Sequence, residues 1–112
     1  MENWISNMSI VELTDENFDQ GITGDIPVLV DFTAAWCGPC RQLAPSLEEL
    51  SEELAGRITI AKVDVDSNQE APSRFGVRGI PALFIFRNGE LIAEMTGVRS
   101  KSDLKRWIEN AI

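Results

Sequence analysis

The two cysteines of this 112-residue chain, Cys37 and Cys40, are separated only by Gly38 and Pro39. A pair at this spacing can supply half of a metal site, form a structural cross-link, or cycle between dithiol and disulfide in a redox reaction. A structural zinc site needs a full set of nitrogen and sulfur ligands, and the chain contains no histidine. Carboxylates or a second chain would have to complete such a site, so the metal interpretation is weak.

A structural cross-link between these cysteines would add little stability. Closing about four residues contributes roughly 2 kcal/mol in the chain-entropy model, against about 3 kcal/mol for a loop of about 15 residues. It would also join residues that a helix already holds one turn apart. The redox interpretation fits better, because residues i and i+3 of a helix lie about 5–6 Å apart at Cα and can form and break a disulfide with little backbone movement.

The positions of the cysteines predict different roles for them. Cys37 is expected where a helix begins after the strand at residues 27–33, and unpaired N–H groups and the helix dipole favour a thiolate there. Cys40, one turn further on, is expected to be more buried and to resolve a mixed disulfide. Pro39 suits the first turn because its missing N–H would be unpaired in any case. Trp36 offers an apolar platform for a protein substrate.

The segments around the pair alternate between the periods of strands and helices. PVLVDFT (27–33) and ITIAKVDV (58–65) are the apolar runs expected of strands buried on both faces. Asn88-Gly89 suits a type I′ turn, which predicts a β-hairpin at this point. The strands predicted in this way cover residues 9–13, 27–33, 58–65, 82–86 and 90–95.

Four helices are predicted between and after these strands. Thr14 is expected to cap a helix that starts at Asp15, with Leu13 and Phe18 forming a hydrophobic staple. The second helix follows the cysteines, with a kink expected at Pro45 and an end at Gly56; its apolar face carries Leu43, Leu47, Leu50 and Leu54. The third is a short helix at 68–75, interrupted or started by Pro72. The last helix covers residues 102–111 and is capped by Ser100 or Ser102.

The resulting order, β-α-β-α-β-α-β-β-α, predicts an α/β fold. We expect a central mixed five-stranded sheet flanked by four helices, with helices on both faces. In such sheets ligands bind where a strand ends and the chain turns into a helix. The cysteine pair lies at a junction of this kind.

Composition limits the partners and the compartment. The net charge of −8 and the pI of about 4.4 argue against nucleic acid and anionic membranes as partners. No run approaches the roughly 18 apolar residues of a membrane span, and the first residues lack signal-peptide features. We therefore expect a cytoplasmic location, where disulfides are usually transient and catalytic. Residues 1–7 are expected to be an appendage, with Met8 as an alternative start, and residues 8–112 a single domain.

WCGPC, followed by KVDVD, GVRGIPALFIF and NGE, resembles the thioredoxin family from about Ser9 to the end of the chain. The resemblance implies a thioredoxin fold and a monomeric protein-disulfide reductase with no bound cofactor. Cys37 would attack the substrate disulfide, and Cys40 would then attack Cys37 to release reduced product. Thioredoxin reductase would re-reduce the pair with electrons from NADPH.

Asp31 is a charged residue within an apolar strand. In isolation it could be a carboxylate that serves a turn or a cap. Alternatively, it is a buried carboxylic acid with a raised pKa that exchanges protons with Cys40. The resemblance implies the second role and a position near Asp31 for Lys62.

The resemblance also implies a substrate-binding rim around the cysteines. Pro81 would be cis and face the sulfurs, and the backbone before it would pair with substrate in strand fashion. Gly97 would let substrate approach; the alternative is a simple strand-end turn. The residues predicted to contact substrate are Trp36, Gly38, Pro39, Ile80, Pro81, Gly97 and Val98.

Three positions depart from the commonest bacterial pattern. Thr33 stands where a second tryptophan is frequent, Ala35 where a polar residue often sits, and Phe75 where tyrosine is frequent. Two other functions stay open. One is an oxidase or isomerase in an oxidising compartment, which Gly38-Pro39 disfavours; the other is a redox-independent binding module that uses the apolar rim.

Overall fold

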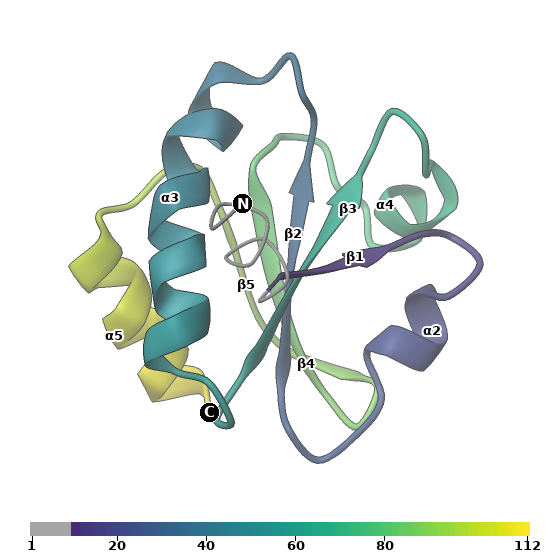
Figure 1. The fold of residues 1–112 in the computed structure, drawn as a ribbon. Coiled ribbons are helices and arrows are strands. Elements are labelled where there is room, and N and C mark those ends of the chain that lie inside the picture. Colours follow the sequence, from purple (N-terminus) through teal and green to yellow (C-terminus); the bar gives the residue numbers. More distant parts are fainter. Residues whose placement is uncertain (1–9) are drawn as a thin grey trace, which may run out of the picture.

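A five-stranded mixed sheet forms the centre of the protein, whose computed structural model describes residues 10–112 (Figure 1). The strand order is β1-β3-β2-β4-β5; β3 pairs in parallel with β1 and β2, and β4 pairs antiparallel with β2 and β5. The strands are β1 (Ile10–Leu13), β2 (Val28–Thr33), β3 (Thr59–Asp64), β4 (Ala82–Arg87) and β5 (Glu90–Thr96). The helices are α2 (Phe18–Gly21), α3 (Gly38–Glu53), α4 (Glu70–Arg74) and α5 (Lys101–Ala111). The predicted fold class and element order are confirmed.

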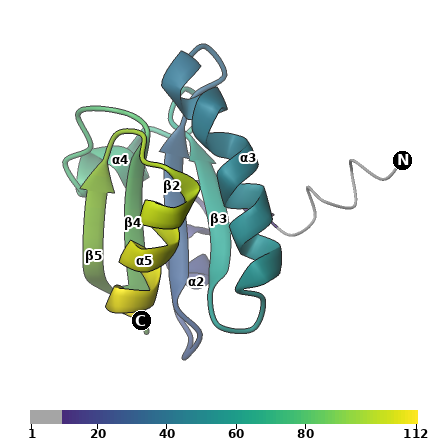
Figure 2. The same cartoon turned by 90° about the vertical axis from the view of Figure 1, so that its left-hand side faces the viewer.

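The sheet divides the interior into two cores. In Figure 1 and Figure 2, α3 and α5 cover one face of the sheet, and α2 and α4 cover the other. Because side chains alternate along a strand, β2 directs Leu29 to the α3 side and Val30 and Phe32 to the α2 side. The leucine-rich core contains Leu29, Leu43, Leu47, Leu50, Leu54, Ile58, Ile60, Leu83, Ile85, Leu104 and Ile108. The phenylalanine core contains Phe18, Phe32, Phe84 and Phe86, and the partly buried Phe75 packs against it.

The first helix was predicted wrongly at its start. It begins at Phe18, and Thr14 does not cap it. The backbone N–H of Thr14 instead donates to Asn17 Oδ1 at 2.7 Å, and the residues between them form a turn. The Asp15 carboxylate accepts hydrogen bonds from two backbone N–H groups at the start of α4, at 2.9 and 3.2 Å. A polar segment that reads as a local cap therefore caps a helix distant in sequence.

The other predicted boundaries agree closely with the structure. Asn88 and Gly89 both have positive φ, 53° and 81°, as a type I′ hairpin turn requires. Ser100 caps α5 by accepting a hydrogen bond from the N–H of Asp103 at 3.2 Å. Gly56 has a φ of 86° in the turn that follows α3.

Part of the domain prediction lies outside the described residues. The proposed appendage at residues 1–7, the alternative start at Met8 and the strand residue Ser9 belong to this part of the chain, so these remain predictions. Between residues 10 and 112, no helix is both long and apolar enough to cross a membrane.

Candidate active site

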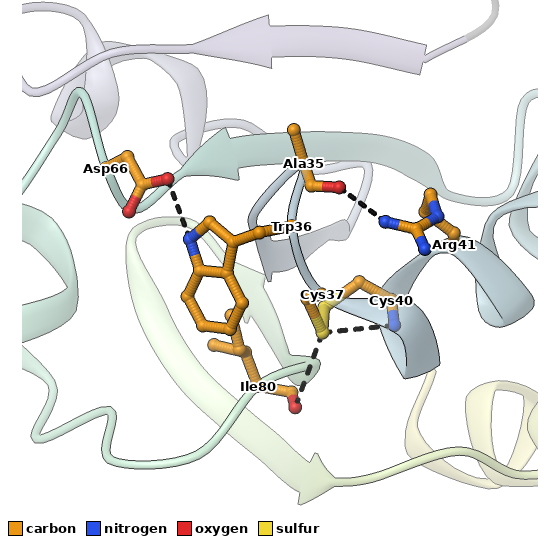
Figure 3. The surroundings of a disulfide bond; sticks show 7 residues. All are labelled: Ala35, Trp36, Cys37, Cys40, Arg41, Asp66 and Ile80. Carbon is orange, nitrogen blue, oxygen red and sulfur yellow. Dashed lines mark hydrogen bonds between the residues drawn. A yellow bond between two sulfur atoms is a disulfide. The ribbon is translucent and has the colours of Figure 1, made fainter.

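The cysteine pair lies where β2 ends and α3 begins. Cys37 occupies the N-cap position of α3, and Gly38 and Pro39 are the first residues of the helix, as predicted. The sulfurs of Cys37 and Cys40 form a disulfide, with the Cα atoms 5.2 Å apart. The backbone N–H of Cys40 donates to Cys37 Sγ at 3.2 Å (Figure 3). A donor already aimed at this sulfur would stabilise a thiolate on Cys37 in the reduced protein.

The two cysteines differ little in burial. Cys37 is 4% exposed and Cys40 is 2% exposed, so the expected contrast between an accessible and a buried sulfur is slight. Ala34 lies in the same small cluster, and Val65 and Ile80 pack against it. The disulfide is therefore in contact with apolar side chains.

Ile80, the residue before Pro81, lies against the cysteine pair (Figure 3). The carbonyl oxygen of Ile80 lies 3.9 Å from Cys37 Sγ, and the Ile80–Pro81 peptide bond is cis. The N–H of Gly97 donates to the carbonyl of Pro81 at 2.9 Å, and the φ of Gly97 is 99°, a value that favours glycine. The predicted cis bond is thus present, and the residue that contacts Cys37 directly is Ile80, the one before Pro81.

Trp36 stands beside the disulfide and is 66% exposed. Its indole N–H donates to the carboxylate of Asp66 at 2.8 Å (Figure 3). Asp66 was not among the predicted site residues. The available signal was its place at the end of KVDVD, one of the segments that carried the family resemblance.

Asp31 is buried beneath the site, on β2. Its Oδ1 has no hydrogen-bond partner among residues 10–112. Burial raises the pKa of Asp31 from 3.8 to about 7, and the positive charge of Lys62 partly opposes this rise. Lys62 is paired with Asp31 in the register between β2 and β3, and Lys62 is exposed.

A cavity of about 260 Å³ lies on the Cys40 side of the disulfide. Asp31, Cys40 and Lys62 all line it, and so does Thr33. The other charged residues on its walls are Glu12, Arg41, Glu48 and Asp64. A smaller cavity of about 190 Å³ lies on the side of Trp36 and is lined by Trp36, Val65, Pro72, Val77, Arg78 and Ile80. Within the described part of the chain, no three or more His, Cys, Asp or Glu side chains are grouped so as to hold a metal ion.

The chain matches a known protein family over most of its length. A family model described as thioredoxin matches residues 9–110. The chain belongs to the thioredoxin family. A thioredoxin from Alicyclobacillus acidocaldarius subsp. acidocaldarius is 48% identical to this thioredoxin-family chain over 100 residues, which cover 89% of the chain and 95% of that protein. Thioredoxin C-2 from Corynebacterium nephridii is 46% identical over 105 residues (93% and 97%), and a thioredoxin from Rhodospirillum rubrum is 44% identical over 102 residues (90% and 98%).

Family membership and the sulfur geometry together define the chemistry. In this thioredoxin-family chain, cysteines at disulfide distance begin a helix that follows a central strand. The protein is a thiol–disulfide oxidoreductase that reduces protein disulfides.

Proposed function

We propose that Cys37 is the nucleophile of this reductase and that Cys40 resolves the mixed disulfide. The observation that carries the proposal is the position of Cys37. Its sulfur caps α3, accepts the N–H of Cys40 and faces the Ile80 carbonyl, where a substrate segment could lie. Cys40 lies one turn further into the helix and lines the larger cavity.

The reaction balances in two displacements at sulfur. The Cys37 thiolate attacks one sulfur of the substrate disulfide; a Cys37–substrate bond forms, the substrate S–S bond breaks, and the departing sulfur takes a proton. The Cys40 thiolate then attacks Cys37 Sγ, the mixed disulfide breaks, and the second substrate sulfur takes a proton. The substrate gains the electron pair that the protein dithiol loses.

Asp31 serves the second displacement by accepting the proton of the Cys40 thiol. A pKa of about 7 suits proton exchange near neutral pH, and Lys62 keeps that pKa from rising further. Both Asp31 and Cys40 line the larger cavity, which gives the proton a route between them. Asp31→Asn is expected to accumulate mixed disulfide in rapid-quench experiments at pH 7; an unchanged second step would contradict this role.

Substrate binds along the rim formed by Trp36, Gly38, Pro39, Ile80, Pro81, Gly97 and Val98. Thioredoxin reductase restores the dithiol with electrons from NADPH, and no cofactor remains bound to the chain. The protein acts as a cytoplasmic monomer. The match of the family model to residues 9–110 supports a single domain that begins near residue 8.

Cysteine variants test the proposed roles. With dithiothreitol as reductant and a disulfide-bonded protein as substrate, Cys37→Ser is expected to abolish the catalysed rate. Cys40→Ser is expected to form a stable mixed disulfide, detectable by mass spectrometry. Turnover by Cys37→Ser would exclude Cys37 as nucleophile. A partner that still binds a Cys37→Ser/Cys40→Ser protein would reveal a redox-independent binding role.

The reduction potential separates a reductase from an oxidase. We expect a value below the glutathione poise of roughly −220 to −260 mV, measured by equilibration with defined dithiothreitol ratios. A value near roughly −180 mV or above would instead favour an oxidase or isomerase.

A further inference from the structure

Half of the ten basic side chains of this acidic protein form ion pairs with described acidic residues, and half do not. Among residues 10–112, the ion-paired basic residues are Arg57, Arg74, Lys101, Lys105 and Arg106. The basic residues that pair with none of the described acidic residues are Arg41, Lys62, Arg78, Arg87 and Arg99. Arg41, Arg78 and Arg99 lie around the disulfide. Lys62 lines the larger cavity, and Arg87 donates to the carbonyl of Ile112.

Arg99 lies in the segment between β5 and α5, next to Gly97 and Val98. Its Nη1 donates to the carbonyl of Val98 at 3.1 Å and lies 3.3 Å from the position that a Cβ on Gly97 would take. Gly97 in turn bonds to Pro81, next to the carbonyl that faces Cys37. The open space above Gly97 is therefore covered by an exposed guanidinium, which keeps further donors for a ligand.

Arg41 and Arg78 extend this charge around the disulfide. Arg41 donates to the carbonyl of Ala35 at 2.7 Å, and Figure 3 shows it on the other side of the cysteine pair from Asp66. Arg78 lines the smaller cavity next to Trp36. Arg41 shares the wall of the larger cavity with Glu12, Glu48 and Asp64. On the side of Trp36 the acidic group is Asp66, which is hydrogen-bonded to the indole of Trp36. On the side of the disulfide formed by Trp36 and Gly97, two positive charges, Arg78 and Arg99, thus face the negative charge of Asp66.

We propose that the rim around the Cys37–Cys40 disulfide selects substrate segments in which acidic side chains flank the disulfide. This inference rests on the reductase function proposed above. A guanidinium forms a planar, charge-assisted pair with a carboxylate, so Arg99 would bind an acidic side chain next to the attacked sulfur. Salt screens charges beyond about 8 Å at physiological ionic strength, so the arginines at the rim act on the segment more strongly than the distant acidic residues do.

The test uses peptides that differ only in charge. Three peptides contain one disulfide each, flanked by Glu, by Gln or by Lys. Each catalysed kcat/KM is divided by the rate at which dithiothreitol alone reduces that peptide, which removes differences in intrinsic reactivity. At low salt, we expect the Glu peptide to be reduced about five- to twentyfold faster than the Lys peptide, and the ratio to fall at high salt.

Charge variants identify the side chain responsible. Arg99→Gln should lower the Glu-to-Lys ratio severalfold, and Arg99→Glu should lower it further. Arg57→Gln is the matched control, because Arg57 follows the far end of α3 and pairs with Glu109. The ratio is insensitive to a general loss of activity.

Two results would overturn the inference. A Glu-to-Lys ratio near one, with all three peptides reduced, would refute the charge preference and leave the reductase function standing. Failure to reduce any peptide would refute the reductase function and the preference together.

Discussion

Asp31 places an ionisable group where its charged form is poorly solvated. Its carboxylate is buried on β2, and this burial raises its pKa to about 7 although Lys62 opposes the rise. Oδ1 has no hydrogen-bond partner among the described residues. In the unfolded chain the value returns to about 3.8. Since the folded state holds the proton more tightly, its stability relative to the unfolded state falls as the pH rises through this range.

Asp31→Asn should remove this pH dependence. Each tenfold difference in proton affinity is worth about 1.4 kcal/mol. In the unmodified protein, ionisation of Asp31 should therefore lower the free energy of unfolding by about 4 kcal/mol between about pH 4 and slightly above pH 7. Relative to the unmodified protein, the variant should gain that amount over the same interval. Denaturant titrations of the oxidised forms would measure it, because the disulfide removes cysteine titration.

The exposed Glu16→Gln variant is the control for loss of one carboxylate and should follow the unmodified protein across the same pH range. A constant difference between Asp31→Asn and the unmodified protein would show that Asp31 ionises freely in the fold.

Trp36 is an exposed indole held by one bond to Asp66. Asp66→Ala should free the ring and reduce turnover of a protein substrate a few fold, because binding would then have to order it. Asp66→Asn keeps an acceptor oxygen and should retain most of the activity. Fluorescence anisotropy decay of Trp36, with the other tryptophans replaced by Phe, would report the added motion. Equal anisotropy decay in both variants and the unmodified protein would exclude this role.

At the scale of elements, α2 and α4 depend on each other through one side chain. The Asp15 carboxylate accepts the N–H groups of Glu70 and Ala71, which open α4. In addition, the N–H of Asp15 donates to Asn68 Oδ1 at 2.9 Å. The segment before α2 is thereby tied to the loop before α4.

Asp15→Ala should lower the free energy of unfolding by about 1–2 kcal/mol, as the loss of a helix cap does. Thr14→Ala should change it by less than about 0.5 kcal/mol, since Thr14 does not cap α2. Chemical denaturation of both variants would separate the two assignments. A larger loss for Thr14→Ala than for Asp15→Ala would restore the local cap that the sequence suggested.

Sequence patterns predicted those elements whose causes are local. Continuous apolar strands, the leucine stripe of α3 and the Asn88-Gly89 turn all depend on neighbouring residues, and all were found. The cap formed by Asp15 and the bond from Trp36 to Asp66 join residues far apart in the sequence. The hydrogen bond from Gly97 to Pro81, which places Arg99 beside the site, also joins residues from different segments. No periodicity encodes such contacts, and each required the fold.

At the scale of the whole molecule, the sheet separates two cores. The leucine-rich core lies under α3 and α5, and the phenylalanine core lies under α2 and α4. Residues in different cores share the sheet but belong to different clusters. Substitutions in one core should therefore be largely independent of those in the other.

Ile108→Val and Val63→Ala test this independence, since they truncate the leucine-rich and the phenylalanine core respectively. We expect losses of about 1 and about 2 kcal/mol, with a coupling energy in the double variant below about 0.5 kcal/mol. Leu104→Ala combined with Ile108→Val, both on α5, is the comparison within one core. Coupling as strong between the cores as within one would mean that the sheet transmits packing changes.

Strand β4 runs from the disulfide to the opposite end of the sheet, where the last described residue, Ile112, lies. The strand starts beside Pro81, at the disulfide, and finishes at Arg87, whose guanidinium donates to the carbonyl of Ile112 at 3.3 Å. Six strand residues span roughly 20 Å at about 3.3 Å per residue, so Ile112 lies at the opposite end of the sheet from the sulfurs (Figure 1). A protein immobilised through a tether after Ile112 would present its cysteines outward, away from the support.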